Sequence, residues 1–318
     1  MMINRPKNLD HSARWVFVPA NDDLVRRFES EAGMTPLLAR SLASRGLASP
    51  VLARQFLDAR LADNLADPFF MKDMEVAADR VARGVESGEK IAIFGDFDVD
   101  GITATVVLMR LLRWLGCEPI YYIPHRIDEG YGMSVEAVDE LARLGTQLLV
   151  TVDNGISSFA EVDHANSLGM ECVITDHHQA GASLPRAVAV VNPNRPDCKY
   201  AFKNLSGVGV AFKLAHAVLK RMNVEKARAK AFLKSCLDIV ALGTVADIVP
   251  LVGENRALVR AGLAMLEKTR NPGLAAMLSL DTGNHRPLQA EAITFYLAPR
   301  LNAAGRTEHA SLAVDLLT

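Results

Sequence analysis

The sequence predicts an α/β protein with a mostly parallel, doubly wound sheet, an N-terminal helical arm and C-terminal helices. Three observations support this fold class. Half of the 318 residues are hydrophobic, which is enough to bury a sizeable core. Between residues 90 and 193, short apolar runs alternate with amphipathic stretches of helix length, a pattern typical of right-handed βαβ units. On either side of this region, apolar residues recur at helical spacing.

Residues 1–75 are expected to form a helical arm without strands. The stretches MTPLLARSLASRGL and SPVLARQFLDARL have helical apolar spacing. Their helices are expected to start at Thr35-Pro36 and Ser49-Pro50. A hydroxyl residue followed by proline favours a helix start, because the first can cap the helix and the second needs no hydrogen bond there.

Five strands are expected in a domain that spans residues 76–252. Each is a short apolar run bounded by Gly, Asp or Pro, as in buried parallel strands. The runs are IAIFG (91–95), PIYYI (119–123), QLLVTV (147–152), ECVIT (171–175) and AVAVV (187–191). Helices are expected between these strands and after Ser206, and residues 253–318 are expected to form a helical connector.

The net charge of −2 conceals two regions of opposite sign. Residues 86–176 contain 16 acidic and five basic residues, whereas residues 195–234 contain ten basic and two acidic ones. An acidic zone can hold cations and a basic zone can face phosphates, although solvated helix faces would produce the same counts. No apolar stretch is long enough to span a membrane and the first residues lack a secretory apolar run, so a cytoplasmic protein is expected.

The segment GDFDVDG (95–101) places three carboxylates, Asp96, Asp98 and Asp100, directly after the first strand. Carboxylates at this spacing repel one another. A divalent cation relieves the repulsion, because Mg²⁺ and Mn²⁺ prefer hard oxygen ligands. The alternative is an aspartate-rich turn that caps a helix.

Three more clusters follow along the chain. They are Asp153 in VTVDNG, Asp176, His177 and His178 in TDHHQ, and Asp247 in GTVADIVPL. Each has an ordinary alternative, such as a turn, a structural histidine or a hydrogen-bonded buried acid. Because ligands of parallel α/β sheets bind beyond the carboxyl ends of the strands, the clusters are expected to converge there. Two divalent ions held in such a cluster suit phosphoester hydrolysis.

In this order the motifs resemble those of the DHH phosphoesterase superfamily. Other segments resemble its bacterial exonucleases specific for single-stranded DNA, and they cover nearly the whole chain from residue 75 onward: IPHRIDEGYGMS, VVNPNRPDC, LSGVGVAFKLA, LGTVADIVPLVGENR and APRLNAAGR. The resemblance implies two Mn²⁺ or Mg²⁺ ions, with the ligands Asp98, Asp100, Asp153, His177 and Asp247. It also implies that His178 and Asp96 are catalytic residues. His178 would contact the scissile phosphate, and Asp96 would be either a further metal ligand or a carboxylate that holds the ligands in place.

The resemblance also implies a two-metal phosphodiesterase that degrades single-stranded DNA from the 5′ end to mononucleotides in recombination and repair. Expected partners are single-stranded DNA, single-strand-binding protein and a helicase, and the expected state is a monomer. Arginine forks match phosphate oxygens, and the candidate phosphate ligands are Arg126, Arg300, Asn302 and Arg306. The alternative role of Arg300 and Arg306 is to hold Glu308 or the Asp247 loop. The basic segment 195–234 is expected to follow the DNA backbone.

Relatives in this family continue into a second domain (DHHA1) with a GGHxxAAG-type signature and then an oligonucleotide-binding barrel. No GGH occurs in these residues, so a truncated form is expected, which binds Mn²⁺ but degrades DNA weakly or without strand preference. Two other functions stay open: a DHH phosphodiesterase acting on short oligonucleotides or cyclic dinucleotides, and a non-catalytic DNA-replication binding module. An inorganic pyrophosphatase is disfavoured by the long basic segment.

Overall fold

The computed structural model describes residues 16, 18–126, 128–280 and 287–318. The chain divides into two compact units, Met1–Asp58 and Ala59–Thr318. The first 15 residues of the expected arm and residues 281–286 of the expected connector lie outside the described residues. Within the described ranges, no helix combines the length and the apolar composition that crossing a membrane requires.

The first unit is a small helical bundle with its own core. Its helices are α1 (Asp22–Ala32), α2 (Pro36–Ser44) and α3 (Pro50–Asp58). Phe28 of α1 and Leu42 of α2 are among the buried residues of this core. As predicted, α2 begins at Pro36, but the Thr35 side chain makes no capping hydrogen bond. The fixed φ angle of proline therefore favours this start without help from a cap.

The second unit is built on a five-stranded parallel sheet with the order β2-β1-β3-β4-β5. The strands are β1 (Ile91–Phe94), β2 (Ile120–Tyr122), β3 (Leu148–Val152), β4 (Glu171–Thr175) and β5 (Ala189–Val191). All five lie within the predicted runs, which confirms the parallel sheet. After β1, the chain adds β2 on one side of β1 and then adds β3 on the other side. Ligands of such sheets bind at this reversal, beyond the carboxyl ends of the strands.

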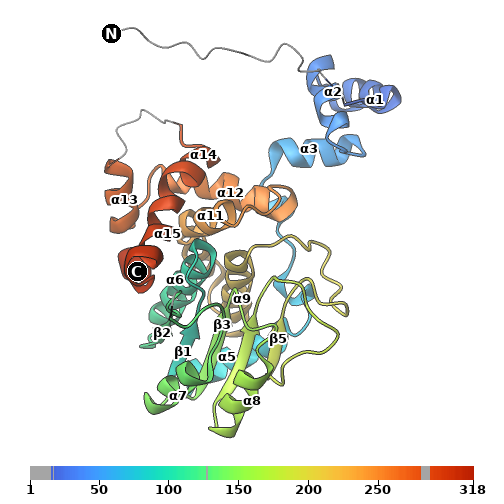
Figure 1. Cartoon of the computed structure of the whole chain (residues 1–318). Helices are drawn as coiled ribbons and strands as arrows, with labels where there is room; N and C mark the ends of the chain where they lie inside the picture. The colour runs from blue at the N-terminus through green and yellow to red at the C-terminus, as the bar shows by residue number, and fades with distance from the viewer. Residues whose placement is uncertain (1–15, 17, 127, 281–286) are drawn as a thin grey trace, which may run out of the picture. The chain divides into compact units, whose positions relative to one another are not determined.

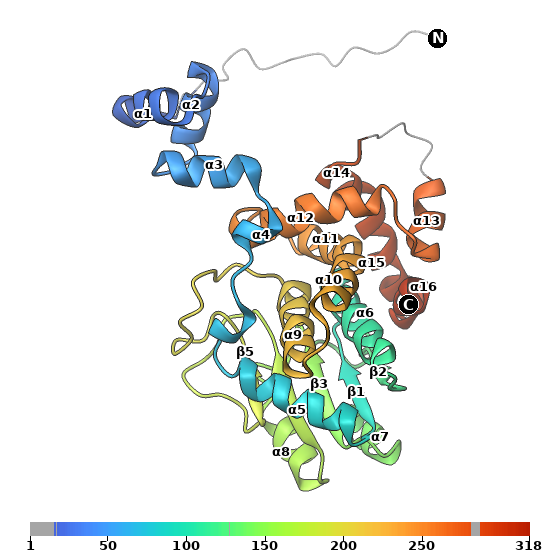
Figure 2. The ribbon, with the colours of Figure 1, turned by 180° about the vertical axis from the view of Figure 1, so that it is seen from behind.

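Helices cover both faces of the sheet, as predicted. Successive side chains of a strand point to opposite faces, so strands that are apolar throughout need cover on both faces. Ile91 and Ile93 belong to the core formed with α5, α6 and α9, whereas Ala92 and Phe94 belong to the core formed with α7 and α8. Figure 1 shows α7 and α8 in front of the sheet, and Figure 2 shows α5 and α9 on the opposite face. The bounds are α5 (Met74–Glu86), α6 (Val99–Trp114), α7 (Val135–Arg143), α8 (Phe159–Ser167) and α9 (Gly207–Arg221).

The helices after α9 form a layer that packs on α6. In this layer α11 packs against both α6 and α12, and α16 packs against α6. The bounds are α10 (Lys226–Ser235), α11 (Leu237–Ala246), α12 (Gly253–Leu266), α13 (Pro272–Ser279), α14 (Ala290–Ala292), a π-helical turn η2 (Ile293–Leu297), α15 (Ala298–Thr307) and α16 (Ser311–Leu317). Before the sheet lie the short helices α4 (Leu61–Asn64) and η1 (Pro68–Phe70). The contact between α11 and α6 brings the end of α11 to the carboxyl edge of the sheet.

Candidate metal centre

The predicted metal and catalytic residues converge at that edge. Asp96 and Asp98 follow β1, Asp100 lies in the first turn of α6, Asp153 follows β3, His177 and His178 follow β4, and Asp247 ends α11. Potential ligand atoms of these seven residues form three-membered groups in which the atoms lie within 4.8 Å of one another. The groups are Asp96–Asp98–Asp153, Asp100–His177–Asp247 and Asp153–His177–His178.

The loop after β1 is a helix cap as well as a part of the acidic cluster. Asp98 Oδ1 accepts the backbone N–H groups of Asp100 at 2.9 Å and Gly101 at 3.0 Å. Asp98 is therefore the N-cap of α6, which satisfies two N–H groups that have no partner within the helix. A Cβ atom at position 101 would lie 2.5 Å from the Asp96 backbone nitrogen. Glycine is required there, because the turn passes close to the helix.

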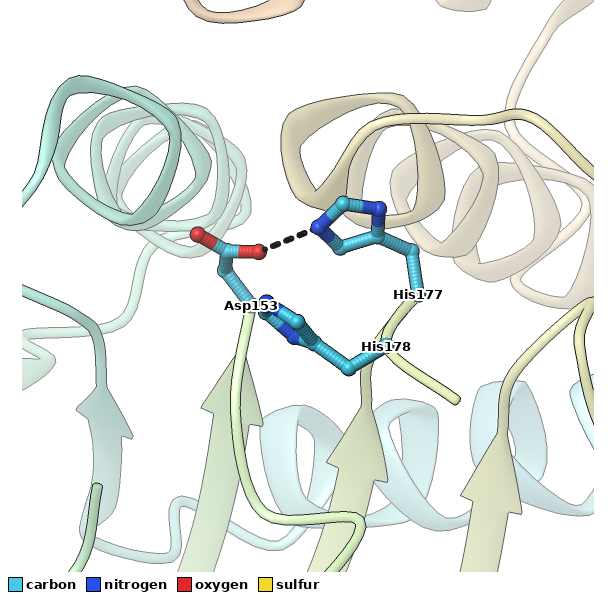
Figure 3. Close-up of side chains that lie close together, drawn as sticks. All are labelled: Asp153, His177 and His178. Atoms are coloured by element: carbon cyan, nitrogen blue, oxygen red, sulfur yellow. Dashed lines mark ion pairs between the residues drawn. The ribbon is translucent and has the colours of Figure 1, made fainter. Parts of the chain in front are cut away.

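Asp153 has a strained backbone and a buried carboxylate. Its φ angle is +62°, a left-handed conformation that residues other than glycine adopt rarely. The side chain is 2% exposed, and its Oδ1 lies 3.0 Å from His177 Nε2. Figure 3 shows the Asp153 carboxylate directed at the His177 ring, with the His178 ring beside it. Strain of this kind persists where the surrounding structure imposes it, commonly at functional sites.

His177 Nε2 is the point at which the clusters meet. It lies 3.8 Å from Asp100 Oδ2 and 3.7 Å from Asp247 Oδ2, in addition to its contact with Asp153. Burial lowers the pKa of His177, so the ring is mainly neutral at neutral pH. A neutral imidazole nitrogen is a metal ligand, whereas a protonated one is not.

Burial and mutual repulsion raise the pKa values of the acidic side chains. The pKa rises to about 7 for Asp96, through burial and the charge of Asp98, and to about 7 for Asp247, through burial and the charge of Asp100. The pKa values of Asp100 and Asp153 are also raised, with burial as the largest cause. Several carboxylates that resist ionisation in one site would become stable anions around a divalent cation.

The donor set fits Mn²⁺ or Mg²⁺. Asp153 Oδ1, His177 Nε2 and Asp247 Oδ2 are buried and have no hydrogen-bond partner among the described residues. Orphaned buried polar atoms are rare and require an explanation. Several carboxylate oxygens with one imidazole are typical ligands for Mn²⁺ and acceptable ones for Mg²⁺. An ion between these atoms would satisfy all three.

His178 is held in place by the buried Asp176, a residue with no separate role among the predicted ligands and catalytic residues. Asp176 Oδ1 lies 2.7 Å from His178 Nδ1 and also accepts the His178 backbone N–H at 3.1 Å. Burial disfavours the Asp176 anion, but hydrogen bonds from His178 outweigh it, and the pKa of Asp176 is lowered. The same hydrogen bond raises the pKa of His178. The position of Asp176 directly before the two histidines was the available signal.

An aromatic cluster lies at the rim of the centre. The Arg126 guanidinium lies 5.0 Å from the centre of the Phe97 ring, and the Tyr131 ring meets the same ring edge-on at 6.4 Å. Tyr131 Oη lies 3.4 Å from both ring nitrogens of His178. Phe97 stands between Asp96 and Asp98 in the sequence. The first motif therefore positions Arg126 and Tyr131 as well as the carboxylates.

The other three candidate phosphate ligands lie on α15. Arg300 donates to the Tyr296 carbonyl at 2.7 Å and stacks on the Tyr296 ring at 3.7 Å, so it is held against the η2 turn that precedes α15. Asn302 is half-buried and Arg306 is exposed. A Cβ atom on the next-door Gly305 would lie 3.4 Å from the Phe97 carbonyl oxygen, which places the Arg306 end of α15 beside the first motif.

The basic segment 195–234 is only partly available to a phosphate backbone. Five of its cations contact groups within the fold. Lys203 donates to two backbone carbonyls. The other four form ion pairs, which are Arg195 with Asp73 and Asp197, Lys213 with Glu254, Lys220 with Asp67, and Arg221 with Asp79. Lys226, Lys230 and Lys234 are exposed on α10. Lys199, before α9, is also exposed, so the cations of the segment that remain available to DNA phosphates lie at Lys199 and on α10.

Comparisons with known proteins identify relatives of this chain. The family described as "DHH family, N-terminal domain" matches residues 90–244. The single-stranded-DNA-specific exonuclease RecJ of Bacillus subtilis is 42% identical over 304 residues, which are 96% of this chain and 37% of the relative. The structure of RecJ in complex with Mn²⁺ from Thermus thermophilus matches with a TM-score of 0.78 and 31% identity, over 95% of this chain and 42% of the other.

A structure of RecJ in complex with Mg²⁺ from the same organism matches with a TM-score of 0.67 and 27% identity, over 95% of this chain and 38% of the other. The chain thus spans less than half of the length of these proteins. Residues 90–244 form a DHH-family N-terminal domain, and over nearly its whole length the chain is homologous to part of the RecJ exonucleases.

Proposed function

We propose that this chain carries the catalytic centre of a metal-dependent nuclease that hydrolyses single-stranded DNA from its 5′ end to mononucleotides. The supporting observation is that Asp153 Oδ1, His177 Nε2 and Asp247 Oδ2 are buried and that their residues belong to groups of candidate ligands whose atoms lie within 4.8 Å of one another. The similarity to RecJ, whose printed name specifies single-stranded DNA, supports the choice of substrate.

We infer two Mn²⁺ or Mg²⁺ sites. Asp96 and Asp98 would hold one ion, Asp100, His177 and Asp247 the other, and Asp153 would contribute to both, because it belongs to the first group and lies 3.0 Å from His177. Bound there, the ions would neutralise the phosphoryl group and activate water for in-line attack.

The protein side chains have separate tasks. His178 shares a hydrogen bond with Asp176 through Nδ1, so a phosphate oxygen or the leaving group would bind at Nε2, in place of the Tyr131 hydroxyl 3.4 Å away. Because the pKa of His178 is raised, its cationic form, which suits a phosphate contact, persists to higher pH. Arg126, stacked on Phe97, and Arg306 would bind phosphates of the strand.

The test is a digestion of long single strands labelled at either end, with Mn²⁺ present. The expected result is release of labelled mononucleotides from the 5′ label first, with loss of activity on chelation and in the Asp98→Ala, Asp100→Ala double variant. Asp163→Asn, which changes an exposed carboxylate paired with Arg186, is the control and should retain activity. Hydrolysis of a dinucleotide but not of the long strand would instead favour an oligonucleotide phosphodiesterase, and Mn²⁺-independent DNA binding without hydrolysis would favour a binding module.

A further inference from the structure

The start of α9 lies against the carboxylate of Asp100. The Gly207 backbone N–H donates to Asp100 Oδ2 at 2.6 Å, and the Val208 N–H donates to Oδ1 at 2.9 Å. Both amides belong to the first turn of α9, where N–H groups have no partner within the helix and the helix dipole is positive. Each carboxylate oxygen of Asp100 therefore accepts one hydrogen bond from α9, and these two bonds fix the orientation of the carboxylate.

The remaining acceptor directions of Asp100 are available to a cation. A carboxylate oxygen accepts in about two directions, so one hydrogen bond leaves Oδ2 with another. Asp100 is 1% exposed, and its Oδ2 lies 3.8 Å from His177 Nε2. The amides of α9 thus determine how Asp100 faces the other candidate ligands.

Gly207 also leaves room for Asp153. A Cβ atom at position 207 would lie 2.3 Å from Asp153 Oδ1 and 2.5 Å from its Cγ. The φ angle of Gly207 is not positive, so this glycine is needed for space and not for an unusual backbone. Asp153 Oδ1 is the atom that faces His177 Nε2. Any side chain at position 207 would displace Asp153 from His177.

The beginning of α9 is anchored to a third helix of the centre. Ser206 Oγ accepts the Gly209 N–H at 3.2 Å and lies 3.0 Å from Thr244 Oγ1 in α11. Since Asp247 is the C-cap of α11, the segment that orients Asp100 is also tied to the helix that carries Asp247.

We propose that Gly207 is a positioning residue of the metal centre, whose amide orients Asp100 and whose missing side chain seats Asp153. The proposal rests on the metal centre of the proposed function but not on its substrate. It assigns a role to the motif LSGVG, which contributes no side chain to the candidate ligands.

The first test compares Gly207→Ala with the control Gly84→Ala, at a helical glycine of α5 away from the centre. At position 84 the three nearest atoms to the added Cβ are side-chain atoms of Arg80, Leu148 and Ile91, at 3.3 Å and beyond. In calorimetric titrations with Mn²⁺, Gly207→Ala is expected to bind at least about tenfold more weakly than the parent chain. Gly84→Ala is expected to remain within about threefold, since no candidate ligand is touched. Parent-like Mn²⁺ binding by Gly207→Ala would overturn the proposal.

The second test needs neither metal nor activity. Asp153→Gly removes the Oδ1, Cγ and Cβ atoms that the new Cβ would meet, and glycine adopts the φ of +62° without strain. In thermal unfolding of the metal-free chain, Gly207→Ala should lower Tm in the parent but not in the Asp153→Gly background, because coupled sites are not additive. The same loss of Tm in both backgrounds would overturn the proposal. If Gly207→Ala does not fold in the parent background, failure of the double variant to fold would overturn it in the same way. A parent chain that binds no Mn²⁺ would contradict the proposed function instead, while this cycle would still decide the role of Gly207.

Discussion

Asp176 Oδ1 lies 2.7 Å from His178 Nδ1, and Asp176 is itself buried while His178 is partly exposed. The carboxylate also accepts the backbone N–H of Ile156, at 3.0 Å through Oδ2. The loops after β3 and β4 are therefore joined by the residue that orients the histidine.

The first prediction concerns Asp176→Asn, which keeps the shape of the side chain and removes its charge. The pKa of His178 should fall, because the hydrogen bond from His178 to Asp176 is the largest cause of its raised value. The NMR titration of the His178 ring in the metal-free chain checks this shift. Nuclease turnover should fall at least about tenfold, as for other residues that orient catalytic groups, while Asp163→Asn should change neither quantity. An unchanged His178 titration would contradict the assigned role of Asp176.

The second prediction concerns pH and stability without metal. Because the pKa values of Asp96 and Asp247 are raised to about 7 from an unfolded value near about 4, the folded chain binds more protons than the unfolded chain between these pH values. The contribution of these two carboxylates to the stability of the metal-free chain therefore falls as pH rises from about 4 to about 7. We expect a Tm lower by roughly 5 °C or more at pH 8 than at pH 5 in the presence of EDTA.

Added Mn²⁺ should reverse this loss, and it should raise Tm more at pH 8 than at pH 5, because the ligands bind the ion as anions. The double variant Asp96→Asn, Asp247→Asn serves as control and should show a flatter dependence on pH. A metal-free Tm that rises steadily across this window would show that these carboxylates are not held above their ordinary pKa.

A buried ion pair joins α9 and α12. Lys213 Nζ contacts Glu254 and donates to the Ala66 carbonyl at 2.8 Å. The Tyr200 hydroxyl donates to Glu254 Oε1 at 2.5 Å. Glu254→Ala leaves a buried cation unpaired and should lower the free energy of unfolding by about 3–5 kcal/mol. Urea unfolding measures it, with Arg186→Ala, which breaks the exposed pair with Asp163, as a control that should leave the free energy of unfolding nearly unchanged. Similar losses in the two variants would contradict this account.

The exposed lysines of α10 provide the fourth prediction. The helix packs near the end of α6, where Arg228 stacks on Trp114, and α6 extends about 24 Å from its first turn to that end. If α10 lies along the bound DNA, the double variant Lys226→Glu, Lys230→Glu should bind single-stranded DNA more weakly. The slope of the logarithm of the binding constant against the logarithm of the salt concentration should become smaller by about 1.4, or about 0.7 for each lost phosphate contact.

Fluorescence anisotropy at several salt concentrations checks this slope. Lys268→Glu, Arg270→Glu makes the same change of charge at exposed positions elsewhere, and it should leave the slope unchanged. Equal effects of the two double variants would indicate a response to net charge and not a binding face on α10.

Much of this protein was determined by the sequence itself. Strand and helix signals lie within short windows, so the five strands could be predicted, and Asp96, Asp153 and His177 could be placed at strand ends because they follow those strands directly. A parallel sheet then has only one edge at which such residues meet. The cap formed by Asp98 was also foreseeable as the alternative to a metal site, and in the structure Asp98 both caps α6 and lies within the acidic cluster.

Only the tertiary structure decided how the remaining groups are used. Asp100 and Gly207 are far apart in the chain, and no local pattern shows that an amide of one would fix the carboxylate of the other. The basic segment looked uniform, yet Lys213 is buried against Glu254 whereas Lys230 is exposed. Charge is a property of composition, but its availability depends on which carboxylates the packing of helices brings within reach, and that is set by contacts distant in sequence.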